Sequence, residues 1–362
     1  MTAPSIETVA KHAGVSTATV SRVLNASGPV SSRSRQVVLD AASNLGYLPL
    51  RRHRGRRKAS VGHPISSICV VAACEPDRNI FHLPVLPDLL TGIERQAESE
   101  GINLMVATVT GDQFPRVLND NSCEGVLFIG TKTNPETAQM LSSRLQSHLG
   151  VWLMRQGNEI DLPFDRIFYD NDAVGRIAGE YLADRGHRHV ALIDPQPYHS
   201  AHGARLDGLS RVCQQRDMQL SACYPSQIIE TPQVTYGQAK AAVDAFLKLD
   251  DRPTGVFVPR DKLTQHVAGC LEAAGIRVGL DVDLVSCDNS PELSGWMPRR
   301  PPSIDIHLEE IGAAGVRQLV QRINDPQAPQ YRTSLTPSLS IPEAWPRWRS
   351  GRQVGSDQAV SA

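Results

Sequence analysis

Residues 8–25 read TVAKHAGVSTATVSRVLN, and their spacing is the strongest indication of how the N-terminal part of the chain folds. Its spacing predicts two short helices, over about 6–13 and 17–25, because the apolar side chains recur with the period of a helix. Gly14 suits the left-handed backbone that ends a helix, and Ser16 suits the cap of the next one. Two helices joined by such a short turn form a helix-turn-helix.

A third helix is predicted over 33–45, with Ser32 as its cap and Gly46 at its end. Ser5 is expected to cap the first helix in the same way. The three helices form an all-α unit of about 46 residues, which is marginally stable alone. The apolar residues expected in its core are Ile6, Val9, Ala10, Ala13, Val20, Val23, Leu24, Val37, Val38, Ala41, Ala42 and Leu45.

The charge of the chain is unevenly distributed. The whole chain has a formal net charge of −1, but residues 1–60 hold ten lysine and arginine residues against two acidic ones. The other 302 residues hold 27 basic and 36 acidic residues. A basic head on an acidic body indicates that one end contacts a polyanion, whereas the alternative is a solvated basic segment of no consequence. Residues 51–65 are predicted to be a basic linker.

From Ser66 onward, apolar runs such as 125–130 and 189–194 alternate with helical stretches. This alternation predicts parallel sheets covered by helices on both faces, and the length of 66–342 suggests two similar α/β lobes. Ligands bind such sheets at the carboxyl ends of the strands, so a cleft between the lobes is expected there. Residues 343–362 are predicted to be a loose polar tail.

The composition is that of an ordinary soluble protein, with 41% hydrophobic and 21% charged residues. No apolar run is as long as a membrane span and no signal peptide is recognised before the first helix, so a cytoplasmic protein that contacts no membrane is expected. The seven cysteines have no C-x-x-C spacing and are expected to be reduced core residues. The two histidines of RGHRHV, residues 185–190, are expected to be structural, and no metal or cofactor is expected.

Three classes of function compete for this chain. An enzyme on an α/β scaffold would need chemistry that no motif supplies, because G-x-S-x-G, G-x-x-x-x-G-K-[ST] and H-E-x-x-H are all missing. A plain solute-binding protein would not need the basic head. A ligand-responsive DNA-binding regulator uses both the helix-turn-helix and the two lobes, so this class is favoured and no enzymatic activity is expected.

The residues also carry a family resemblance. The stretches TVAKHAGVSTATVSRVLN at 8–25 and VSSRSRQVVLDAASNLGYLP at 30–49 resemble the DNA-binding head of the lac repressor/galactose repressor family. Later patches are similar to the family's effector-binding core, which has a periplasmic-binding-protein-like fold: DNDAVGRIAGEYLADRGHRHVALI, ARLDGLSRVC, GCLEAAGIRVGLDVDLVSCDN and PPSIDIHLEEIGAAGV. The resemblance implies a homodimeric transcriptional repressor that binds a palindromic DNA operator with an affinity set by a small molecule.

For DNA contact, the resemblance assigns base readout to three residues, Thr17, Ala18 and Arg22. An arginine can grip guanine O6 and N7 with two hydrogen bonds, and methyl groups can touch a thymine methyl. Short hydroxyl and amide side chains near the start and flank of a recognition helix suit phosphate contact. The residues expected in that role are Ser16, Thr19, Ser21, Asn25 and Ser31. Plain helix capping is the alternative role of each hydroxyl.

For the effector, the resemblance places Arg205 of ARLDGL and Asp288 of SCDN in the cleft. Asp261 matches the family pattern, whereas Arg260 stands where the family usually has an asparagine. Arg155 lies at the end of another predicted strand. Carboxylates and arginines in a cleft suit a small polar ligand such as a sugar, a sugar acid or a nucleoside. Two alternatives stay open: a structural ion pair between Arg205 and Asp288, and a regulator that answers to a protein partner or to no ligand.

The linker departs from the family pattern. Arg56 stands where the family has a leucine that wedges into the minor groove, and Arg54 lies beside it. Arginines can instead lie in a narrow, A·T-rich minor groove, so these two residues are expected to contact DNA. The alternative is a flexible tether that touches nothing specific. The C-terminal leucine heptads that make tetramers in the lac repressor are missing, and a dimer is therefore expected.

Overall fold

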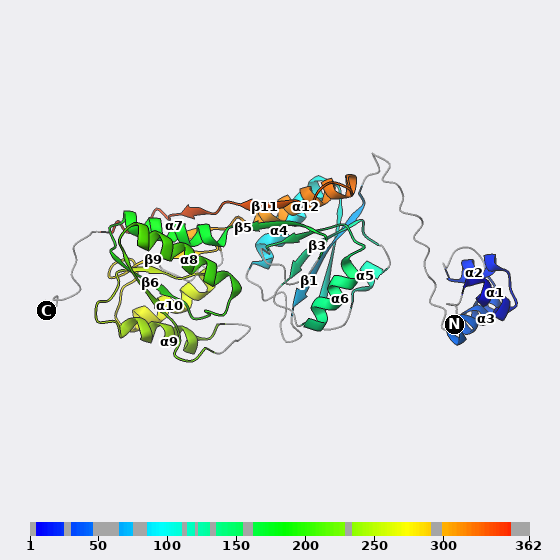
Figure 1. Cartoon of the computed structure of the whole chain (residues 1–362), viewed down its shortest axis with the longest axis horizontal. Coiled ribbons are helices and arrows are strands. Elements are labelled where there is room, and N and C mark those ends of the chain that lie inside the picture. The colour runs from blue at the N-terminus through cyan, green and yellow to red at the C-terminus, as the bar shows by residue number, and fades with distance from the viewer. Residues whose placement is uncertain are drawn as a thin grey trace. The chain divides into compact units, whose positions relative to one another are not determined.

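The computed structural model describes residues 5–24, 30–45, 65–74, 85–110, 114–119, 122–130, 135–154, 162–228, 234–290 and 299–348. The chain divides into two compact units, residues 1–63 and 64–362 (Figure 1). The first unit is all-α and the second is α/β, as the sequence predicts.

The first unit contains α1 (Ile6–Ala13), α2 (Thr17–Leu24) and α3 (Ser32–Asn44). Gly14 has a φ of 62° and ends α1 in the left-handed conformation, which confirms the prediction. Ser5 caps α1 through a capping box, in which the backbone N–H of Thr8 donates to Ser5 Oγ.

Two predictions for α3 are wrong. The helix begins at Ser32, and its cap is Ser31, whose Oγ accepts a hydrogen bond of 3.2 Å from the Ser34 N–H. Val37 is 41% exposed rather than buried. It lies off the stripe of Val38, Ala41, Ala42 and Leu45, whose spacing of three and four residues keeps them on the inner face of the helix. The other predicted core residues with described side chains pack together as expected.

The first lobe of the second unit is a parallel six-stranded sheet in the order β11-β5-β4-β3-β1-β2. Helices α4 and α12 cover one face of this sheet, and α5 and α6 cover the other (Figure 1). Its elements are β1 (Ser67–Cys74), α4 (Leu86–Ser99), β2 (Asn103–Thr110), α5 (Arg116–Asn119), β3 (Gly125–Gly130), α6 (Pro135–Leu145), β4 (Gly150–Leu153), β5 (Asp165–Tyr169), α12 (Leu308–Asn324) and β11 (Arg332–Leu335).

The second lobe holds a six-stranded sheet in the order β12-β10-β9-β8-β6-β7, in which β10 and β12 pair antiparallel. Helices α7 and α8 cover one face, and α9 and α10 cover the other (Figure 1). Its elements are α7 (Asn171–Asp184), β6 (His189–Ile193), α8 (Ser200–Gln215), β7 (Gln219–Cys223), α9 (Tyr236–Leu247), β8 (Gly255–Phe257), α10 (Asp261–Ala273), β9 (Asp283–Cys287), β10 (Ser303–Asp305) and β12 (Ser338–Ser340).

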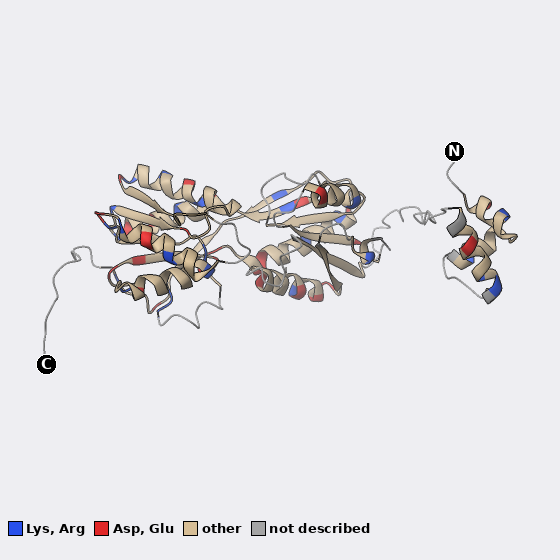
Figure 2. Ribbon diagram, turned by 90° about the horizontal axis from the view of Figure 1, so that it is seen from below, with Lys and Arg blue, Asp and Glu red and all other residues tan. Residues whose placement is uncertain are grey.

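The described chain passes between the lobes from β5 to α7, from β10 to α12 and from β11 to β12. Each of these connections is short, so the ends of the two sheets meet at the crossings. The sequence reading did not single out α12, β11 or β12, which complete the lobes late in the chain. In Figure 2 the basic and acidic residues of the second unit are interspersed over both lobes.

The prediction of a loose tail from residue 343 onward is wrong for its first residues. Trp345 is only 6% exposed, and its Nε1–H donates to Asp283 Oδ1 at 3.0 Å. Arg185 also donates to Asp283 and, at 2.7 Å, to the Pro346 carbonyl. The buried Asp283 carboxylate needs these donors, which is why the segment packs against the lobe. Residues 349–362 lie outside the described part of the chain, as does most of the 51–65 linker.

The predictions for cysteine and for RGHRHV agree with the packing. The cysteines with described side chains are free, and five of them are buried: Cys69, Cys213, Cys223, Cys270 and Cys287. His187 is buried between Thr254 and Asp283, so its role is structural. Among the described residues, no helix is long and apolar enough to cross a membrane.

Candidate DNA interface and ligand site

The second helix of the first unit presents the predicted base-reading residues to solvent. Thr17, Ala18 and Arg22 are exposed, whereas Val20 and Val23 of the same helix are buried. The turn before α2 therefore places the N-terminal end of this helix and Arg22 on an open surface. Such a surface is the part of a helix-turn-helix that enters a major groove.

The hydroxyl residues around α2 and α3 act first as caps. The Thr19 N–H donates to Ser16 Oγ at 3.1 Å, and the two side-chain oxygens lie 2.9 Å apart. Ser31 caps α3 and donates its own proton to Ser34 Oγ at 2.9 Å. Capping is thus confirmed for Ser16, and it is compatible with exposure to a phosphate. Ser21 is half-buried, and the predicted contacts Asn25, Arg54 and Arg56 lie outside the described residues.

In the second unit, Arg205 of α8 is the centre of a buried polar cluster. Its side chain is 2% exposed. Nε donates to Asn171 Oδ1 at 3.0 Å, and one terminal nitrogen donates to Tyr169 Oη at 3.0 Å. The other terminal nitrogen donates to the carbonyl oxygen of Pro259. Tyr169 ends β5 of the first lobe, so Arg205 of the second lobe binds groups from both lobes at the strand ends.

Asp288 follows β9 and faces two arginines of this cluster. Its Oδ1 lies 3.8 Å from a terminal nitrogen of Arg205, and its Oδ2 lies 3.8 Å from Nε of Arg260. Both distances exceed hydrogen-bond length, so the carboxylate keeps the capacity to accept hydrogen bonds from a ligand. Asp288 also has a φ of 106°, a strained conformation for a residue with a side chain. Strain of this kind is concentrated at functional sites.

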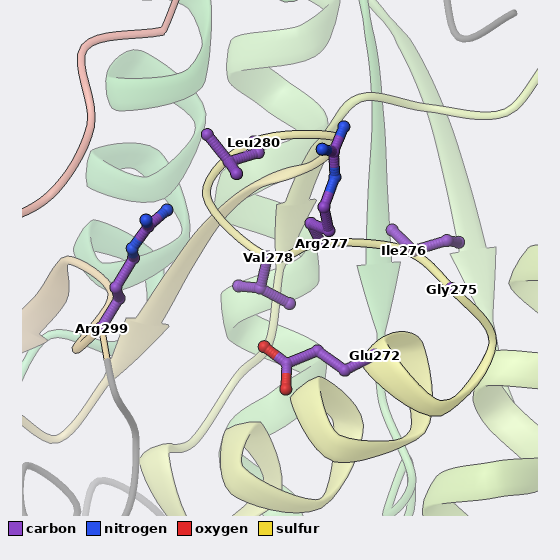
Figure 3. Close-up of a pocket in the computed structure, with 7 residues that line it drawn as sticks. All are labelled: Glu272, Gly275, Ile276, Arg277, Val278, Leu280 and Arg299. Carbon is purple, nitrogen blue, oxygen red and sulfur yellow. The ribbon is translucent and has the colours of Figure 1, made fainter. Parts of the chain in front are cut away.

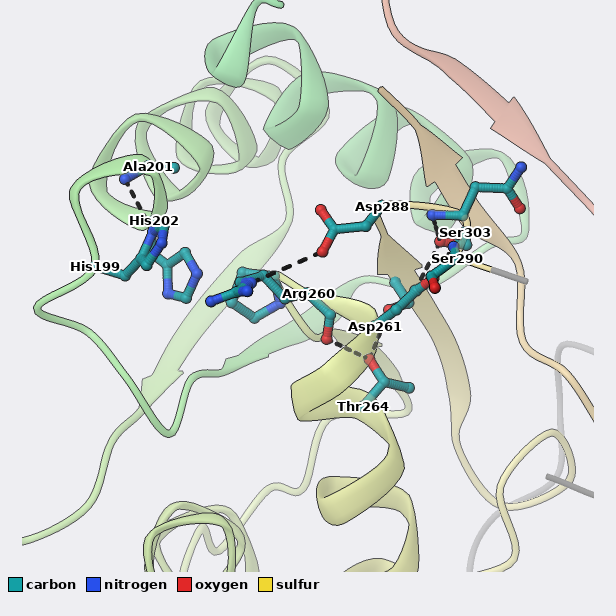
Figure 4. A network of polar contacts seen from close by, with 12 residues as sticks. His199, Ala201, His202, Arg260, Asp261, Thr264, Asp288, Ser290 and Ser303 are labelled. Carbon is teal, nitrogen blue, oxygen red and sulfur yellow. Dashed lines mark hydrogen bonds and ion pairs between the residues drawn. The ribbon is translucent and has the colours of Figure 1, made fainter. Parts of the chain in front are cut away.

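Asp261 and Arg260 differ in what they offer a ligand. Both carboxylate oxygens of Asp261 accept hydrogen bonds of 2.8 Å, from the Ser290 N–H and from Ser303 Oγ. Asp261 therefore holds the segment after β9 and the start of β10 in place. Arg260 precedes α10, is half-buried, and points its guanidinium toward Asp288 (Figure 4). Arg155, the remaining predicted ligand residue, lies outside the described residues.

Sequence reasoning missed Asp194, His202, Tyr169 and Asn171, which the fold adds to the same strand ends. Asp194 follows β6 and Tyr169 ends β5. Both are polar residues at the end of an apolar strand, which is a signal that could have found them, because ligands bind α/β sheets at the carboxyl ends of the strands. His202 had no such signal, because its pairing with Asp194 depends on how α8 packs.

Burial shifts the pKa of three ionisable groups in this cluster. Burial raises the pKa of Asp288, while Arg205 and Arg260 act in the opposite direction. Burial raises the pKa of Asp194 to about 7. Burial also lowers the pKa of His202, and the positive charges of Arg205 and Arg260 lower it further. Such perturbed groups at strand ends are typical of a functional site.

A separate pocket of about 380 Å³ lies on the second lobe (Figure 3). It is lined by Glu272, Gly275, Ile276, Arg277, Val278, Leu280 and Arg299. These residues include the C-terminal end of α10, whereas Arg260 precedes its N-terminal end. A helix of 13 residues is about 20 Å long, so this pocket is not part of the Arg205 cluster.

Comparisons with known proteins match both units of the chain. Residues 5–49 match the family described as bacterial regulatory proteins, lacI family, and residues 180–341 match the periplasmic binding protein-like domain. The HTH-type transcriptional regulator CelR of Thermobifida fusca is 27% identical over 348 residues, which cover 94% of this chain and 98% of that protein. The HTH-type transcriptional repressor PurR of Aliivibrio fischeri is 26% identical over 336 residues, covering 89% and 92%.

Solved structures give the same result for the fold. A complex of the transcriptional regulator CelR with cellobiose has a TM-score of 0.61 and 25% identity, covering 93% of this chain and 98% of that one. A lac repressor dimer bound to operator and the anti-inducer ONPF has a TM-score of 0.59 at 21% identity, covering 93% and 98%. The similarity to the lac repressor dimer supports the fold alone.

The helix-turn-helix unit and the two-lobed unit together define a DNA-binding transcriptional regulator with a periplasmic-binding-protein-like domain. Residues 5–49 are similar to the lacI family of bacterial regulatory proteins, and the chain as a whole is similar to the regulators CelR and PurR.

Proposed function

We propose that this regulator is a dimeric repressor whose affinity for a palindromic operator is set by a small polar ligand bound at the Arg205 cluster. The observation that carries the proposal is the geometry around Asp288. Two arginines lie 3.8 Å from its carboxylate, beyond hydrogen-bond length, so its oxygens can accept hydrogen bonds from ligand hydroxyls. A structural ion pair between Arg205 and Asp288 alone would not need a strained backbone at Asp288.

The chemistry of the cluster fits a hydroxylated ligand. Asp288 accepts hydrogen bonds, while Arg260 and the remaining N–H groups of Arg205 donate them. The CelR structure was solved with cellobiose, a hydroxylated sugar, which makes sugars the first class to test. Asp261, whose oxygens are taken up by Ser290 and Ser303, acts in this proposal as a positioning residue.

On the DNA side, Arg22 reads a base and Thr17 and Ala18 contact base edges, while Ser16, Thr19 and Ser21 contact phosphates. Support comes from the exposure of the first three residues on one helix and from the cap geometry of Ser16. The lac repressor of the solved operator complex is a dimer, and a dimer explains the expected palindrome, because each half-site is read by one helix-turn-helix.

The test starts with selection of an operator from random duplexes by the full-length protein. Binding to the selected operator is then measured with cellobiose, glucose, glucuronate and hypoxanthine, for the parent protein, Asp288→Asn and the control Asp251→Asn. Asp251 is exposed and precedes β8, whereas Arg260 of the cluster follows the carboxyl end of that strand. Asparagine tolerates a positive φ, so Asp288→Asn keeps the backbone and removes the charge.

We expect at least one probe to change operator binding by the parent and by Asp251→Asn. In Asp288→Asn the affinity for that probe falls by about 10–100-fold, because hydrogen bonds to a charged group contribute about 1.5–3 kcal/mol. Operator binding that ignores every probe in all three proteins would favour the alternative, a regulator that answers to a protein partner or to no ligand.

A further inference from the structure

A second buried polar pair, formed by Asp194 and His202, lies at the same strand ends. Asp194 follows β6, and His202 lies in the first turn of α8. His202 Nδ1 is 2.9 Å from one Asp194 oxygen and 3.0 Å from the other. Both side chains are 1% exposed. The Gln196 N–H donates to Asp194 Oδ1 at 2.9 Å and holds the carboxylate toward the ring.

The other ring nitrogen of His202 is left without a partner. Nε2 is buried and makes no hydrogen bond with any group in the part of the chain that the structure describes. A buried polar atom without a partner is destabilising, so native proteins rarely keep one unless a function uses it. Figure 4 shows His202 on the first turn of α8, with Arg260 and Asp288 on the neighbouring strand ends.

The protonation state of the ring follows from its surroundings. Burial and the charges of Arg205 and Arg260 hold the pKa of His202 below its usual range, so the imidazole is neutral at physiological pH. Burial raises the pKa of Asp194 to about 7, so at pH 8 this carboxylate is ionised and accepts a hydrogen bond. The single ring proton then lies on Nδ1, where it bonds Asp194. Nε2 is left as an unprotonated hydrogen-bond acceptor.

We propose that His202 Nε2 accepts a hydrogen bond from a hydroxyl or amide N–H group of the effector, and that Asp194 is the positioning residue that fixes this tautomer. The inference rests on the proposed function, because it places the effector at the Arg205 cluster. It adds an acceptor on the α8 side to the acceptor at Asp288. The site therefore selects a neutral, hydroxylated ligand over one whose carboxylate faces α8, because a carboxylate cannot donate to Nε2.

Two substitutions at His202 separate hydrogen bonding from packing. His202→Leu removes the acceptor, whereas the side-chain amide of His202→Gln can present an oxygen in its place. His12→Leu is the control, because His12 is an exposed histidine of α1. Cellobiose, glucose and glucuronate are titrated into each full-length protein at pH 8 by calorimetry. We expect the affinity for cellobiose or glucose to fall at least tenfold in His202→Leu, to recover in part in His202→Gln, and to stay unchanged in His12→Leu.

A measurement on the unsubstituted protein does not depend on how the variants fold. In protein labelled with 15N at histidine, the His202 signals are identified by their loss in His202→Gln. At pH 8 we expect the proton on Nδ1 and none on Nε2, and the Nε2 resonance should move toward that of a hydrogen-bonded acceptor when a neutral sugar binds.

The outcomes distinguish a failure of this inference from a failure of the proposed function. A probe that binds the parent and His202→Leu equally, or an Nε2 that carries the proton at pH 8, contradicts the inference and leaves the proposed function standing. Tighter binding of glucuronate than of both neutral sugars, with loss in His202→Leu, contradicts the predicted ligand class. If no probe binds and none changes operator binding, both proposals fail together.

Discussion

The carbonyl oxygen of Arg205 occupies the space that a side chain at Gly175 would need, because a Cβ atom there would lie 1.9 Å from it. Helices α7 and α8 cross at this point, and Gly208 makes the reciprocal close approach to the Asp172 carbonyl. The backbone of the residue at the centre of the ligand cluster is therefore set by a glycine on another helix.

Gly175→Ala should push α8 away and displace Arg205. We expect a loss of about 1–3 kcal/mol in the free energy of unfolding, as for other overpacked cores, and weaker binding of the effector. Gly203→Ala is the matched control on α8, because a Cβ at Gly203 meets nothing within 4 Å. Denaturant unfolding and ligand titration check both variants, and equal behaviour of the two would show that the helix crossing does not set the site.

Arg22→Ala should weaken operator binding by about 1–3 kcal/mol per half-site and relax the base preference at the contacted position. The control is Arg211→Ala, which removes an exposed arginine from α8 of the second unit. Electrophoretic mobility shift on operators with each base at that position measures the effect. A uniform loss on all sequences would instead mark Arg22 as a phosphate contact.

Trp345→Phe keeps an aromatic ring but removes the N–H that donates to Asp283. Removing a donor from a buried charged acceptor costs about 1–3 kcal/mol, so a lower midpoint in denaturant is expected, with no change in operator sequence preference. A midpoint equal to that of the parent would mean that Arg185, Tyr181 and His187 satisfy this carboxylate without the tryptophan.

The buried Asp194 should make stability depend on pH. Its pKa is raised from 3.8 to about 7 in the folded protein, so the folded state holds a proton that the unfolded chain has already lost. Its contribution to stability is therefore full below about pH 4 and is lost as the pH rises to about 7. Asp194→Asn cannot ionise, so its stability relative to the parent should increase between pH 5 and pH 8. Thermal unfolding of both proteins across that range tests the sign, and a constant difference would contradict it.

Local spacing was enough to predict the first unit. The positions of Gly14 and Ser16 relative to the apolar residues define the turn between α1 and α2, and these interactions act over a few residues. The start of α3 was misplaced by one residue, because Ser31 and Ser32 are both able to cap and only the hydrogen bond to Ser34 distinguishes them.

The alternation of strands and helices in the second unit can be predicted from local patterns, since buried parallel strands and their covering helices have recognisable apolar spacings. Which polar residues meet depends instead on how the elements pack against one another. Tyr169, Asp194, Arg260 and Asp288 follow or end four different strands and lie up to 119 positions apart. The last three converge because the parallel strands of the second lobe bring their carboxyl ends to one edge, and Tyr169 joins them from the first lobe through its bond to Arg205. Packing between elements also lowers the pKa of the buried His202 and sets the backbone of Arg205 through the helix crossing at Gly175. No local pattern in the sequence encodes either property.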